Sequence, residues 1–133
     1  MMDITASHPL QDAWLDFSYK SLQWHFERTR GFVYAAANDA MPGWLKVGKT
    51  QNLQQRIEQL NHAGVLGRTR IVFYLETQDR HWLESATHRW LKASGVESQK
   101  EFFKTSLDMV QAGICSLEAR DKQLFSIAGF YGR

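Results

Sequence analysis

The chain has 133 residues, of which 44% are hydrophobic and 13% aromatic, and a formal net charge of +2. This is enough apolar material for one globular domain, and the mildly basic balance allows a nucleic-acid partner without requiring one. The single cysteine, Cys115, excludes a disulfide within the chain. No apolar run is long enough to span a membrane, and the N-terminal residues lack the apolar core of a signal peptide. We therefore expect a cytoplasmic domain with no membrane partner.

The first predicted element is an amphipathic helix at residues 9–29. Leu10, Trp14, Leu22 and Phe26 recur at roughly helical spacing, with polar residues between them. We interpret this segment as a packing helix. A role in dimer formation or in specificity is the alternative, so the oligomeric state stays open and a homodimer is one option.

The next predicted element is a β-hairpin. Residues 32–37 and 44–49 have strand composition, and the residues between them are typical of a turn. Such a hairpin would bring a phenol, Tyr34, close to two amines, Lys46 and Lys49. Packing alone does not require these side chains, so the hairpin is a candidate for chemistry.

A helix is predicted directly after the hairpin. Asn52 is a suitable N-cap, with Gln55 three residues later, and the helix should run to about Asn61. Its buried stripe is predicted to consist of Leu53, Ile57 and Leu60.

The rest of the chain alternates strands and helices. We predict a strand at 69–76, a helix capped by Thr77 or Asp79 that runs to residue 93, a short strand at 100–104 and a helix at 106–118. The core face of the helix ending at residue 93 is predicted to contain Trp82, Leu83, Ala86, Trp90 and Leu91. The predicted fold is α+β, with a small central antiparallel or mixed sheet of three or more strands flanked by helices.

Four motifs in this order resemble the GIY-YIG endonuclease superfamily. They are FVY followed by KVGKT, the helix NLQQRIEQLN, the helix WLESATHRWL, and KEFFK, which is similar to a segment of the bacteriophage T5-type subfamily. Arg56 follows the motif glycine, Gly48, by eight residues, as in the family pattern. The resemblance covers residues 31–114, which leaves 1–30 as a helical extension and 115–133 as a C-terminal segment that packs on the domain.

The resemblance implies hydrolysis of DNA phosphodiester bonds with one divalent metal ion, Mg²⁺ or Mn²⁺. It implies that Tyr34 is the base that activates water, because neighbouring cations can stabilise a phenolate. Lys46 stands where most of the family has its second tyrosine. It leaves Tyr34 as the only phenol of the pair, with Lys46 as a neighbour that lowers the pKa of Tyr34 or orients water.

Further site residues follow from the same resemblance. Arg56 would hold phosphate oxygens as charge builds in the transition state. Gly48 would allow close approach of a helix or a phosphate, and Lys49 would point at substrate phosphate. His62 is a weaker candidate for the substrate site.

Glu84 is the implied metal ligand, since a hard cation can bind one carboxylate together with water and phosphate. His81 and His88 share its helix face, and zinc is the minor alternative because there is no HExxH motif. His88 would then be a supporting or core residue. Glu101 would position Arg56 or the metal-bound water.

Two other functions remain open at this point. A binding module without catalysis would hold DNA through basic residues: Lys46, Lys49, Arg56, Arg68 and Arg70. A protein-interaction domain would use the N-terminal helix and a tryptophan-rich surface for assembly. The presence of Tyr34, Arg56 and Glu84 together favours the nuclease.

Overall fold

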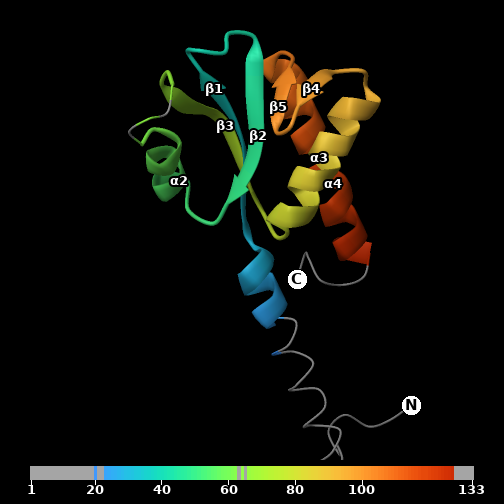
Figure 1. The fold of residues 1–133 in the computed structure, drawn as a ribbon. Helices are drawn as coiled ribbons and strands as arrows, with labels where there is room; N and C mark the ends of the chain where they lie inside the picture. The colour runs from blue at the N-terminus through green and yellow to red at the C-terminus, as the bar shows by residue number, and fades with distance from the viewer. Residues whose placement is uncertain (1–19, 21–22, 63, 65, 128–133) are drawn as a thin grey trace, which may run out of the picture.

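The computed structural model describes residues 20, 23–62, 64 and 66–127, with a five-stranded antiparallel sheet at the centre (Figure 1). The strand order is β3–β1–β2–β5–β4. The strands are β1 (Gly31–Asn38), β2 (Trp44–Thr50), β3 (Thr69–Thr77), β4 (Glu97–Gln99) and β5 (Phe102–Lys104). The helices are α2 (Leu53–Leu60), α3 (Arg80–Ala93) and α4 (Leu107–Ile127), and residues 23–29 are also helical. The predicted α+β fold and the predicted hairpin are confirmed.

The sheet separates two layers of helices. In Figure 1, α2 lies on one side of the sheet and α3 and α4 lie together on the other. Side chains on a strand alternate between faces, so Val33 and Ala35 join the core beneath α3 and α4. Tyr34 and Ala36 point to the α2 face. The site described below depends on this alternation.

Local signals set several of the helix ends. The side chain of Asn52 accepts a hydrogen bond from the backbone N–H of Gln55, and the side chain of Asp79 accepts one from the backbone N–H of Trp82. Gly95 has a φ of +83° directly after the C-cap of α3, a conformation that glycine adopts without strain. Asp79, not Thr77, is therefore the N-cap of α3.

The structure differs from the prediction in three elements. The last helix runs to Ile127 rather than 118, since residues 119–127 contain no glycine or proline to stop it. The strand β4 was not predicted; it pairs with β5 through a two-residue turn in which Lys100 has a φ of +57°. The apolar stripe of α2 is only half-buried, because no other described helix packs over this short helix.

Residues 9–19 and 21–22 of the predicted N-terminal helix lie outside the described residues, as does the predicted packing of the apolar C-terminal side chains. Within the described part of the chain, no helix is both long and apolar enough to cross a bilayer.

Candidate active site

Tyr34 and Gly48 face each other across the β1–β2 ladder. Tyr34 is completely buried, and a Cβ atom built on Gly48 would lie 2.6 Å from its Cζ and would overlap its hydroxyl. The phenol therefore lies directly over the backbone of Gly48. The close approach predicted for this glycine is real, but the approaching group is the ring of Tyr34 rather than a helix or a phosphate.

Arg56 contacts the phenol of Tyr34 from helix α2, which covers this face of the sheet. Its Nε–H donates to the hydroxyl oxygen of Tyr34 over 2.9 Å, and its Nη1 donates to Gln59 over 3.3 Å. Arg56 lies four residues after the N-cap Asn52, and its side chain reaches from α2 to the sheet. The two residues that the family pattern singles out for base and phosphate contact are therefore hydrogen-bonded to each other.

The pKa of Tyr34 is raised above its usual value of 10.0. Burial is the main cause, because it disfavours the charged phenolate, and the negative charges of Glu101 and Glu84 act in the same direction. The hydrogen bond and the positive charge of Arg56 oppose the rise. Arg56 thus acts on this pKa in the expected direction, but burial outweighs it.

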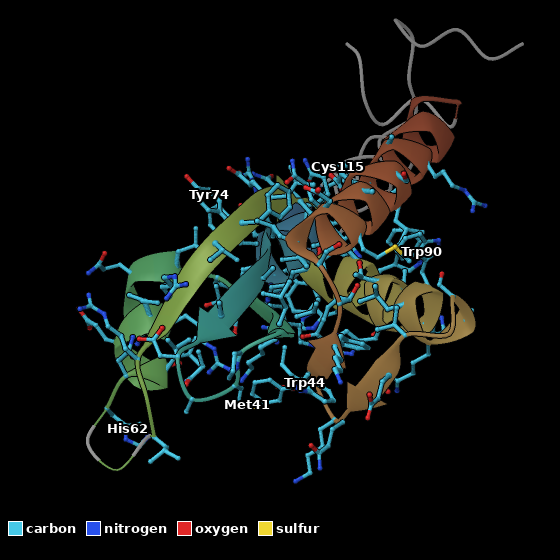
Figure 2. All side chains as sticks on the ribbon, turned by 90° about the horizontal axis from the view of Figure 1, so that it is seen from above. Met41, Trp44, His62, Tyr74, Trp90 and Cys115 are labelled. Atoms are coloured by element: carbon cyan, nitrogen blue, oxygen red, sulfur yellow. The ribbon has the colours of Figure 1, made fainter. Side chains whose placement is uncertain are left out.

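Lys46 shares the α2 face with Tyr34 and forms an ion pair with Glu101. Its Nζ lies 3.3 Å from the Glu101 carboxylate and 5.9 Å from the centre of the Phe102 ring. Lys46, Arg56 and His62 line one hollow of about 320 Å³ between the sheet and α2. Figure 2 shows His62 in the loop after α2. The predicted residues Lys46, Arg56 and His62 are thus brought together.

Lys49 lies on the other side of the sheet. It is three residues after Lys46, and an odd spacing reverses the face in a strand. Its Nζ lies 3.7 Å from the carboxylate of Glu84 on α3. The two amines therefore lie on opposite faces of the sheet, and only Lys46 shares the face of Tyr34.

The open edge of β2 explains how Glu84 approaches the site from the opposite layer. Strand β5 pairs with β2 only over Trp44–Lys46, and the backbone N–H of Val47 donates to the Glu101 carbonyl. The carbonyl of Val47 lies 2.8 Å from Nε2 of His88. Since a carbonyl can only accept, this Nε2 carries the proton. His88 thus fixes α3 against the uncovered edge, and Glu84 lies one turn earlier on the same helix face.

The side chains beside this edge of β2 determine which metal ion could bind there. Among the described residues, no group of three or more His, Cys, Asp or Glu side chains is placed to share an ion, and His88 already contacts a backbone carbonyl. A zinc site of the usual kind does not fit. One carboxylate, Glu84, fits a hard cation whose remaining ligands are water and phosphate oxygens. Lys49 would have to release Glu84 for this to occur.

Arg68 and Arg70, which were predicted to hold DNA, lie away from the hollow that Lys46 and Arg56 line. Arg70 pairs with Asp39 over 2.8 Å at the solvent surface, and Arg68 lines a separate hollow beyond α2 with Tyr74. Figure 2 shows Tyr74 projecting from β3. Sequence reasoning did not find the contact between His88 and the backbone of Val47. The shared helix face of His88 and Glu84 was the only available signal.

The comparison with protein-family models matches residues 31–117 to the T5orf172 domain. The chain belongs to the T5orf172 domain family. The match covers β1 to the middle of α4 and so includes every site residue described above. T5orf172 domains occur in nuclease-like proteins of phages and bacteria, which points to a nuclease-like or DNA-binding role. Neither the curated proteins nor the solved structures gave a match.

Proposed function

We propose that this T5orf172 protein is a divalent-metal-dependent DNA endonuclease with a GIY-YIG-type site. The observation that carries the proposal is the part-buried hydrogen bond between Arg56 and Tyr34, in which Arg56 also lines a hollow beside Lys46. A packing tyrosine needs no arginine, and this arginine reaches both the phenol and the hollow that Lys46 and His62 line. The arrangement supports phosphodiester chemistry because it combines an ionisable oxygen with two cations.

In the proposed reaction, Tyr34 reacts as a phenolate, after its own proton has left to solvent. The phenolate takes a proton from water as the water oxygen forms a bond to phosphorus and the bond to the leaving oxygen breaks, and the leaving oxygen takes a proton from solvent. Arg56 is already 2.9 Å from the phenol oxygen, so a phenolate at this atom has a charged partner. The outer nitrogens of its guanidinium can hold phosphate oxygens. Lys46 adds a second positive charge on the same face.

Glu84 is the residue that would hold the divalent ion in this proposal. When bound there, Mg²⁺ or Mn²⁺ would supply positive charge for the phosphate and the leaving oxygen, and would offset the carboxylate charge that contributes to the raised pKa of Tyr34. Lys49 neutralises Glu84 in the absence of the ion and is close enough to turn to a phosphate when the ion is present. Glu101 forms an ion pair with Lys46, which lines the hollow.

Plasmid nicking in Mg²⁺, Mn²⁺ or EDTA tests the proposal. The wild type should nick with a metal ion and not with EDTA. Tyr34→Phe and Glu84→Gln should each lose most cleavage, while Glu84→Gln should bind DNA in EDTA at least as well as wild type, since a negative charge has left the phosphate site. Arg89→Gln, at an exposed position of α3, is the charge control and should cleave normally.

If the wild type nicks no form of DNA with either ion, the enzymatic proposal is wrong. Salt-dependent DNA binding without cleavage would then identify a binding module.

A further inference from the structure

A separate, polar hollow of about 510 Å³ lies between residues 23–29 and the N-terminus of α3. Its described lining is Trp24, His25, Arg28, Thr29, Gln51, Arg80 and His81. Four of these residues lie in the helix before β1, which the T5orf172 match does not include. No carboxylate is among the described lining residues, so the hollow favours an anionic ligand.

The helix that carries this hollow is fixed to the domain. The guanidinium of Arg80 donates to the carbonyls of Arg28 and Arg30 over 2.6 and 3.0 Å. The hydroxyl of Thr29 donates to the carbonyl of Gln78 over 2.8 Å. These bonds join the end of the helix to the start of α3, so side chains on the helix have a defined position relative to α3.

An aromatic side chain is presented to solvent at this site. Trp24 is 59% exposed, although it is the largest apolar side chain type, and the guanidinium carbon of Arg28 lies 4.7 Å from the centre of its ring. A solvent-exposed indole combined with an arginine is a suitable surface for a nucleotide base and its phosphate.

The hollow also adjoins the proposed cleavage site. His81 lines it and lies one helical turn before Glu84 on α3. Gln51 lines it and follows directly after β2, two residues beyond Lys49. The positive charge of Lys49 contributes to the lowered pKa of His81, after desolvation and Arg80, so the two sites are electrostatically in contact. A DNA strand that extends beyond the phosphate at the proposed cleavage site would reach this hollow next.

We propose that Trp24 and Arg28 form a subsite for an unpaired DNA strand next to the scissile phosphate. A base stacks on Trp24, and Arg28 holds the adjacent phosphate. A base inside a duplex is already stacked on its neighbours, so the subsite selects DNA with a single-stranded or frayed segment. This inference rests on the proposed nuclease function and specifies its substrate class.

Binding in EDTA tests the subsite separately from cleavage. Fluorescence anisotropy would compare a labelled blunt duplex with the same duplex carrying a single-stranded extension. We expect wild type to bind the extended duplex about tenfold more tightly, the scale of one stacked base. Trp24→Ala should reduce this ratio to about one, and Trp24→Phe should retain most of it because a ring remains.

Arg28→Gln should also reduce the ratio, whereas Arg89→Gln, the exposed arginine control on α3, should not change it. Circular dichroism and thermal unfolding establish that each variant is folded. If Trp24→Ala keeps the wild-type ratio, or wild type shows no preference, the subsite is wrong, while Tyr34-dependent nicking would leave the nuclease proposal intact. If wild type binds neither DNA form, both proposals are wrong.

Discussion

Arg56 donates a hydrogen bond to the buried hydroxyl of Tyr34 over 2.9 Å, although the two residues are 22 positions apart. The bond joins α2 to the centre of the sheet. It also gives the phenol oxygen a cationic partner at a depth where an unpaired phenolate would be strongly disfavoured. If the nuclease proposal is right, the two residues act as one unit.

Substitution of Arg56 tests this unit. Arg56→Lys keeps the charge but loses the planar fork, so we expect the nicking rate to fall by about 10²–10³, the usual effect of removing one transition-state donor. Tyr34→Phe should cause a loss of similar size. The double variant should be little worse than either single variant, because residues that act together are not additive. Losses that multiply would mean that Arg56 and Tyr34 act independently.

Gly48 is the subject of the second prediction. Gly48→Ala forces a methyl group into the ring of Tyr34, and we expect the free energy of unfolding to fall by about 1–3 kcal/mol. The cost should be much smaller in a Tyr34→Ala background, where the obstructing ring is gone. Urea unfolding of the four proteins of this cycle measures the coupling. Equal costs in both backgrounds would show that the ring is not what excludes a side chain at this position.

The raised pKa of Tyr34 predicts a specific loss of stability at high pH. Below about pH 10 the phenol is neutral in the folded and unfolded protein, so its full contribution is present. Above that pH the unfolded chain loses the proton first, and the free energy of unfolding falls until the folded phenol also ionises. The slope from this one group is at most about 1.4 kcal/mol per pH unit.

The Tyr34→Phe variant should lack the part of the fall in the free energy of unfolding at high pH that comes from this phenol. Unfolding by urea at several pH values between neutrality and strong alkali would measure it. Tyr74→Phe, at a position that is 57% exposed, is the matched control and should follow the wild type. If the decline is the same in Tyr34→Phe as in the wild type, burial of this phenol does not affect its ionisation.

The elements that local patterns determine were predictable from the sequence. The alternation in β1 and β2, the caps at Asn52 and Asp79, and the glycine after α3 depend on neighbouring residues. Strand β4 was not predictable in this way, because a three-residue strand with no apolar pattern forms only when β5 is beside it. The length of α4 was underestimated, although residues 119–127 contain no glycine or proline that would end a helix.

The sequence suggested candidate site residues but not their arrangement. The resemblance proposed Tyr34, Arg56 and Glu84, whereas the layers that they come from depend on tertiary packing. Glu84 approaches the edge of β2 from the α3 side because β5 leaves that edge uncovered and the side chain of His88 fills it. Burial likewise determines the direction of the Tyr34 pKa shift, and burial is a property of the whole fold.

The last prediction concerns the ion pair between Lys49 and Glu84. The Glu84 side chain is only 13% exposed, and Lys49 is the cation that offsets its charge at 3.7 Å. A divalent ion at Glu84 must therefore displace Lys49. Lys49→Gln removes the competitor, so we expect Mn²⁺ to bind several-fold more tightly, as measured by the electron paramagnetic resonance signal of the free ion.

The same variant should bind DNA more weakly in EDTA, with a shallower dependence on salt, because one phosphate contact is lost. Lys46→Gln is the matched control: it removes a lysine from the opposite face, where Glu101 is the partner, so Mn²⁺ affinity should stay near the wild-type value. Glu84→Gln should bind no Mn²⁺ at the concentrations that saturate wild type. Unchanged Mn²⁺ affinity in both Lys49→Gln and Glu84→Gln would place the metal elsewhere, and Glu84 would then be the structural partner of Lys49.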